Sequence, residues 1–161
     1  MTQGLTPELF ISPDVDLNLG DPGYLEAVNF TKEDLRNRWK TQLGVNILAR
    51  WRANNFDRTA LEQLVGKVYG HLDIRGIPLF EQEIRNVNLS DVEFYCSDLH
   101  GTLFDHVNLS NTYLSETNLN GTRFEWCRMD SVLIDSVDFN EKTSFVGVNL
   151  STINFNLAVL L

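Results

Sequence analysis

The sequence predicts an all-β solenoid with an α-helical cap, in which a four-sided β-helix of about 4–5 coils follows two N-terminal helices. Two observations lead to this fold class. Large apolar residues recur every five residues through the C-terminal half, and the preceding segment has the periodicity of helices. The 161 residues are 43% hydrophobic and 22% charged, a composition typical of a folded chain long enough to bury a core.

Three segments are expected along the chain: an irregular segment at 1–30, a helical cap at 31–71 and the β-helix at 72–161. Prolines and glycines punctuate the first segment, as in Gly20-Asp21-Pro22-Gly23, and such residues favour turns over regular elements. We expect this segment to wrap the junction between cap and solenoid.

The cap should contain two helices. Thr31 resembles an N-cap, and an apolar stripe that includes Leu35, Trp39 and Trp51 predicts a helix over about 32–53. A second apolar stripe predicts a helix over 59–69, with Gly70 as its stop. Such helices would cover the open first coil, because a solenoid must hide the core and strand edges at its ends.

Basic residues and two tryptophans in this cap could also suggest a nucleic-acid-binding helix pair. However, residues 1–71 carry 8 basic against 9 acidic side chains, whereas DNA-binding domains have a strong basic surplus. Direct nucleic-acid binding is therefore not expected.

The five-residue period defines the β-helix. We call its large apolar sites the central positions; they are Ile74, Leu79, Ile84, Leu89, Phe94, Leu99, Phe104, Leu109, Leu114, Leu119, Phe124, Met129, Ile134 and Phe139. The period then slips by one residue and continues through Phe145, Leu150, Phe155 and Leu160. Two residues before each central position stands a smaller, mostly β-branched or hydroxyl-bearing side chain.

A period of five fits neither the 3.6-residue helix nor a plain strand. A short extended piece would point the central residue and the residue two before it to the same side, and the polar remainder would turn the chain. Four such corners close a square coil, and stacked coils about 4.8 Å apart would exchange backbone hydrogen bonds. Both apolar columns are predicted to fill the interior.

The residue before the central position is often Asn or Asp, as in Asn88, Asp98, Asn108 and Asn118. This pattern resembles the pentapeptide-repeat family, over about 90 of the 161 residues. The resemblance implies a right-handed quadrilateral β-helix. The departures from the family pattern at this position include Leu103, Tyr113, Arg123, Arg128 and Leu133.

Charge and the lack of catalytic motifs narrow the function. The net charge is −9, and residues 72–161 hold 13 acidic against 5 basic side chains, which suits a basic protein partner and repels an anionic membrane. We find no cofactor motif, nucleophile pattern or metal-ligand spacing among the histidines, and Cys96 and Cys127 are expected to be free thiols. The chain has no apparent signal peptide or apolar span, so a cytoplasmic, non-enzymatic protein is expected.

The candidate interaction surface lies on the outside of the coils. With four pentads in a coil, residues twenty apart share a face, so Glu93, Tyr113 and Leu133 should form one column with Tyr95 beside it. The C-terminal residues Leu157, Val159, Leu160 and Leu161 would either fold over the last coil or contact a second copy. The resemblance favours the homodimer, because related proteins often dimerise through this end.

Two functions follow from these expectations. The first is a non-catalytic protein-interaction or scaffold module that uses an acidic β-helix surface. The alternative, which the resemblance suggests, is a DNA-mimicking modulator of a type II topoisomerase such as gyrase, of the quinolone-resistance type. The acidic half has the sign that such a mimic needs, but a stack of about 20 Å spans only about six base pairs unless a dimer doubles it.

Overall fold

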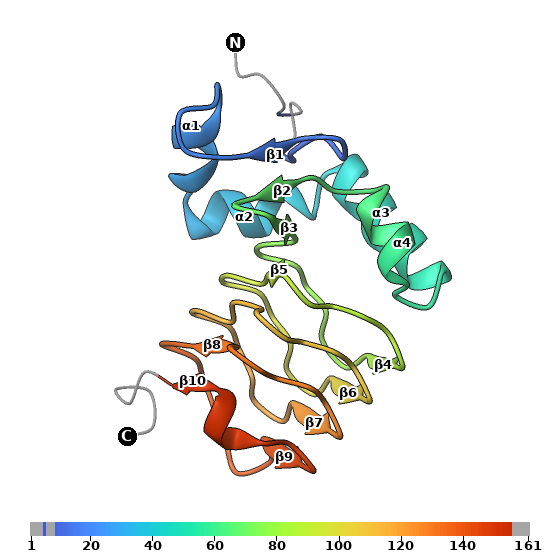
Figure 1. The fold of residues 1–161 in the computed structure, drawn as a ribbon. Coiled ribbons are helices and arrows are strands. Elements are labelled where there is room, and N and C mark those ends of the chain that lie inside the picture. Colours follow the sequence, from blue (N-terminus) through green and yellow to red (C-terminus); the bar gives the residue numbers. More distant parts are fainter. Residues whose placement is uncertain (1–4, 6–8, 156–161) are drawn as a thin grey trace.

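The computed structural model describes residue 5 and residues 9–155. It is a β-solenoid of about 4 turns with helices at its N-terminal end, which confirms the predicted fold class. Figure 1 shows the cap above the stacked coils, with α1 and α2 over one side of the solenoid and α3 and α4 over the other.

Strand pairing confirms that four pentads make one coil. On one side, β4 (Glu83–Arg85), β6 (Leu103–Asp105) and β7 (Arg123–Glu125) pair in parallel with offsets of twenty residues, as in Ile84↔Phe104↔Phe124. From β7 to β9 (Ser144–Val146) the offset is 21, with Phe124 opposite Phe145. The expected one-residue slip is thus accommodated in the turn at 140–143, where Thr143 N donates to Asn140 O.

The second strand column lies on the opposite side of the coil. It contains β3 (His71–Asp73), β5 (Val92–Glu93), β8 (Leu133–Ile134) and β10 (Asn154–Phe155). We call this side face 1 and the β4–β6–β7–β9 side face 3. Face 2 and face 4, which connect them, are held by single parallel bridges such as Asp98↔Asn118 and Asn88↔Asn108.

The Asn and Asp residues before the central positions have a structural role. Asn88, Asn108 and Asn118 each accept, through Oδ1, a hydrogen bond of 3.0 Å from the backbone N–H two residues later. This closes a local turn of the kind that Asn and Asp side chains favour. These side chains shape faces 2 and 4.

The successive corners from Gly76 to Ser136 each contain a residue with left-handed backbone. The residue two places after the central position has a positive φ at successive corners: Gly76, Glu81, Asn86, Asp91, Cys96, Gly101, His106, Asn111, Glu116, Gly121, Trp126, Ser131 and Ser136. Glycine, asparagine and aspartate accept this conformation most readily. The other residue types at these corners adopt the left-handed conformation although their backbones intrinsically disfavour it.

The interior of the solenoid is packed by the predicted columns. Central residues from Ile74 to Ile134 are almost fully buried, and Phe124 stacks on Phe104 at 5.4 Å and on Phe145 at 5.0 Å between ring centroids. The buried Thr122 hydroxyl is satisfied by the neighbouring coil, since Thr122 Oγ1 donates to Leu99 O at 2.7 Å. The expectation for Leu150 is wrong: it is 48% exposed and begins the 3-10 helix η1 (Leu150–Thr152), in the last described coil.

The described residues contain four helices at the N-terminal end, which we together call the cap. In the segment expected to be irregular lies α1 (Tyr24–Val28), and three helices replace the two expected over 31–71: α2 (Lys32–Arg38), α3 (Gln42–Ala53) and α4 (Arg58–Glu62). The helix expected over 32–53 is broken because Thr41 caps α3 by accepting from Gly44 N. A Cβ at Gly44 would lie 2.3 Å from Arg38 O, so the two helices meet at a close turn.

The end of the cap is a small sheet. After α4 the chain enters β2 (Lys67–Val68), which pairs antiparallel with β3, and Tyr69 and Gly70 make the turn with φ of 53° and 74°. Gly70 is therefore a hairpin residue and not a helix stop. In the segment expected to be irregular, β1 (Asp16–Leu17) pairs parallel with β2, so the sheet of face 1 continues into the cap.

Candidate interaction surface

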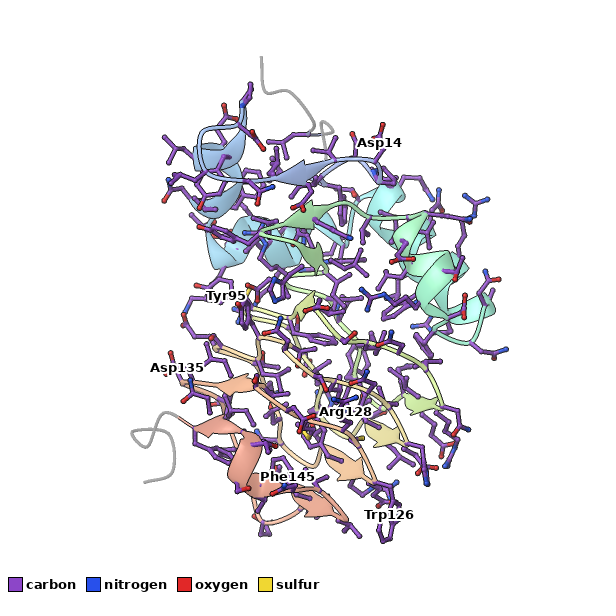
Figure 2. The ribbon with its side chains drawn as sticks, viewed as in Figure 1. Asp14, Tyr95, Trp126, Arg128, Asp135 and Phe145 are labelled. Carbon is purple, nitrogen blue, oxygen red and sulfur yellow. The ribbon has the colours of Figure 1, made fainter. Side chains whose placement is uncertain are left out.

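The structure brings the four candidate surface residues together on face 1. Parallel bridges stack Glu93 on Tyr113 and Tyr113 on Leu133, and Tyr95 follows Glu93 by two residues on the same side. All four are half-buried. Figure 2 shows Tyr95 at the edge of the solenoid just below the cap, on the opposite side from Trp126.

Tyr113 is held in place by an aromatic contact. Its ring stacks on the His71 imidazole, with centroids 4.3 Å apart and an interplanar angle of 22°. His71 itself lies between two backbone carbonyls, at 2.9 Å from Tyr69 O and 3.0 Å from Asn111 O. The column therefore presents a positioned aromatic side chain rather than a loose one.

The upper end of this column opens into a pocket between cap and coils. The pocket has a volume of about 240 Å³ and is lined by Val28, Phe30, Val68, Tyr69, Arg75, Glu93 and Tyr95. We call it the seam pocket. It shares Glu93 and Tyr95 with the column, and the column together with the pocket is called the face 1 surface. The sequence pattern did not indicate the cap residues of the pocket, because they become neighbours of the repeat only when the cap packs on the coils.

A buried charge cluster lies behind the seam pocket and joins cap to solenoid. Asp73 accepts from Arg38 of α2 at 2.9 and 3.0 Å and from Arg75 Nε at 2.7 Å. Burial by itself would raise the pKa of Asp73, but the two guanidinium groups outweigh it and hold that pKa well below the ordinary value. The ionised carboxylate thus pins α2 against the first coil.

Glu93 is in a different environment from Asp73. Its Oε1 accepts a hydrogen bond of 2.9 Å from Tyr95 N. Burial raises the pKa of Glu93 to about 7, although that hydrogen bond and the nearby Arg75 act in the opposite direction. Glu93 therefore changes charge near neutral pH.

Other surface features were not indicated by the pattern. Trp126 is 59% exposed at a corner between faces 3 and 4, where its ring packs on Gly147. A further hollow of about 410 Å³ lies under α2 along face 2, lined by residues that include Arg36, Lys40, Asp98 and Asp138. Asp98 already accepts from His100, through N and Nδ1, which gives it a structural explanation.

The expected C-terminal contact, Leu157, Val159, Leu160 and Leu161, lies outside the described residues. The last described coil has a less buried interior than the others. Phe139, Phe145 and Phe155 are only partly buried there. This part of the candidate site therefore stays a prediction.

The described part of the chain shows neither a metal-binding cluster nor a membrane-spanning helix. Residue 5 and residues 9–155 contain no group of three or more His, Cys, Asp or Glu side chains placed to hold a metal ion. Within the same residues, no helix has the length and apolar character needed to span a bilayer.

Fold and surface together define a capped β-solenoid, a class of protein whose coils present flat outer faces around a filled interior. The family model for pentapeptide repeats matches residues 83–111 and 93–133, with eight copies. The match confirms pentapeptide repeats within residues 83–133, as the sequence pattern predicted. No curated protein matches the chain.

Proposed function

We propose that this chain is a non-catalytic protein-binding module and that its partner docks on the face 1 surface. One observation carries the proposal: the column of Glu93, Tyr113 and Leu133 ends in a pocket that shares Glu93 with it. An aromatic and apolar strip that ends in a recess is the arrangement that protein interfaces use for their anchor residues.

The composition of the column supports a role outside the fold. At Tyr113 and Leu133, apolar side chains replace the Asn or Asp that elsewhere accepts a backbone N–H, as Asn118 does. These two side chains cannot accept that backbone N–H, and both stay half-exposed on the outside of the coil, although Tyr113 also stacks on His71. An interface gives them a reason to be there.

The filled interior supports a binding role over catalysis. Central residues from Ile74 to Ile134 are buried against one another, so a ligand would have to bind on the outside. Catalytic acids and bases need a desolvated cleft around the reacting atoms. The pentapeptide-repeat family fits a non-catalytic interaction module.

The charge distribution does not favour the DNA-mimic alternative. A mimic must present rows of unpaired negative charge, whereas Arg123 lies 3.4 Å from Glu125 and Arg128 lies 2.6 Å from Asp130. Asp73 is buried between two arginines. A gyrase supercoiling assay tests the alternative directly, and we expect neither inhibition nor protection.

Affinity capture from the native cell tests the proposal when it is run with matched variants. A Tyr95→Ala and Leu133→Ala double variant removes half-buried side chains from face 1. An Arg123→Ala and Glu125→Ala double variant alters the opposite face without changing net charge. We expect a partner that the wild type and the face 3 variant retain and the face 1 variant loses. Equal recovery by all three proteins would refute the proposal.

A further inference from the structure

The seam pocket has the walls of a site for a positive charge. Phe30 and Tyr69 reach it from the cap, and Tyr95 reaches it from the coils. Aromatic rings attract cations through the negative potential of their faces. The Glu93 carboxyl lies among these rings and accepts a hydrogen bond from Tyr95 N at Oε1.

The pocket suits a side chain better than a metabolite. Its volume of about 240 Å³ is below the range of about 300–1,000 Å³ that small-molecule sites occupy. Val28 and Val68 line it as well, so an entering group should have an apolar stem. Lysine and arginine have such stems beneath their charged ends.

Arg75 is the cation already present, and three of its five N–H donors bind within the protein. Its Nε and Nη2 donate to Asp73 at 2.7 and 3.2 Å, and its Nη1 donates to Ala27 O at 2.8 Å. Asp73 faces this guanidinium but is shared with Arg38, so the three groups together keep one positive charge behind the pocket. Glu93 has no such partner of opposite charge in direct contact among the described ion pairs.

Long-range charge points to the same kind of partner. The chain carries a net charge of −9, which attracts basic proteins and accelerates their encounter. We propose that the seam pocket receives a lysine or arginine side chain of the partner protein, with the Glu93 carboxylate as its counter-ion. This inference rests on the proposed function and names the chemistry of the partner.

Binding should depend on pH through Glu93. The groups that face it are Asp73 and Arg75 of the first coil, Tyr95 of its own coil, Tyr113 of the next coil and Tyr69 of the cap. With the pKa of Glu93 at about 7, the ionised fraction of the free protein falls about tenfold from pH 8 to pH 6. The affinity for a basic side chain should fall by a similar factor.

The test is an NMR titration of the full chain with N-acetyl-lysine amide and N-acetyl-arginine amide, followed at the backbone amides of Glu93 and Tyr95. N-acetyl-norleucine amide is the neutral control probe, with an apolar stem and no charge. We expect saturable shifts with the basic probes, binding about tenfold weaker in Glu93→Gln, and an affinity that no longer varies with pH in that variant. Glu141→Gln, at an exposed site in the slip turn, should bind as the wild type does.

Three results would overturn the inference: equal binding of the norleucine probe, unchanged binding in Glu93→Gln, or no saturable shift with either basic probe. Each is distinguishable from failure of the proposed function. If capture of a partner depends on Tyr95 and Leu133 while the basic probes do not bind, the proposed docking on face 1 is retained and the proposed lysine or arginine in the seam pocket is refuted. If capture does not depend on face 1 either, both proposals are refuted.

Discussion

Glu93 affects both the stability of the fold and the proposed binding of a basic side chain. Its carboxyl group is placed by a strand and a backbone hydrogen bond, yet burial makes its ionised form costly. A buried carboxyl group whose ionisation destabilises the free protein is stabilised in its ionised form when a cation binds beside it. This is the behaviour expected of a recognition residue rather than of a structural one such as Asp73.

The stability of Glu93→Gln relative to the wild type should therefore depend on pH. The pKa of Glu93 is raised from 4.5 to about 7 on folding, so the folded chain holds the proton more tightly than the unfolded chain does. The contribution of Glu93 to stability is then fully present below pH 4.5 and is lost as pH rises to about 7. Urea unfolding should show the variant about equal to the wild type at pH 4.5 and more stable by about 2 kcal/mol at pH 8.

Glu141→Gln serves as the control for this measurement, because Glu141 is exposed. The difference in the free energy of unfolding between Glu141→Gln and the wild type should be small and constant across the same pH range. If the difference between Glu93→Gln and the wild type is also constant, the carboxyl group is not the strained group that we describe.

The left-handed backbone of the corner residues should affect stability. Ser131 has a φ of 59°, a conformation that costs an ordinary residue about 1–2 kcal/mol. Ser131→Gly should raise the free energy of unfolding by about 0.5–1 kcal/mol after the entropy of glycine is subtracted. Ser131→Val should lower it, because a β-branched residue is a genuine outlier at positive φ. Thermal unfolding of the two variants checks this, and a reversed order would contradict the corner geometry.

Among the elements, α2 determines how the cap meets the solenoid. It is tied down by Arg38 through Asp73, and it passes directly over the first corner. A Cβ at Gly76 would lie 2.5 Å from Leu35 O. The seam pocket lies between this cap and the same first coils.

Alanine at Gly76 should therefore cost more than alanine at Gly70. The two glycines have similar φ values, 79° and 74°, but nothing lies within 4 Å of a Cβ at Gly70. Gly70→Ala should cost only the conformational term of about 1 kcal/mol, and Gly76→Ala at least about 2 kcal/mol more, because backbone must shift. Urea unfolding of both proteins provides the comparison. Equal costs would mean that α2 does not pack on the corner as described.

The elements also show what the sequence could predict. The five-residue period predicted the coil, the slip and the stacking of Glu93, Tyr113 and Leu133. It could do so because every central residue packs into the interior in the same way. The break of the expected 32–53 helix at Thr41 was not predicted, since it depends on the close approach at Gly44. The seam pocket was not predicted because Phe30 and Tyr69 meet Glu93 only when the cap packs on the coils, and no sequence period links them.

At the scale of the whole molecule, the two ends of the solenoid differ. The first coil is covered by the cap, whereas Leu150 in the last described coil is 48% exposed. Exposed apolar residues at one end of a rod favour a two-fold contact with a second copy. We expect multi-angle light scattering to give a mass twice the 18.4 kDa of one chain.

Deletion of residues 157–161 should shift this mass to that of a single chain. A monomeric mass for the undeleted protein would contradict the expected dimer and leave the face 1 surface unaffected. The dimer and the docking surface are independent, because face 1 runs along the side of the stack and not across its end (Figure 1).

Amide hydrogen exchange of the chain with and without its captured partner tests the docking surface on face 1 most directly. We expect added protection at β5, β8 and Tyr95, together with the cap residues at the seam pocket. Face 3, with β4, β6 and β7, should exchange as in the free protein. Protection confined to face 3, or none on face 1, would contradict the assignment of the docking surface.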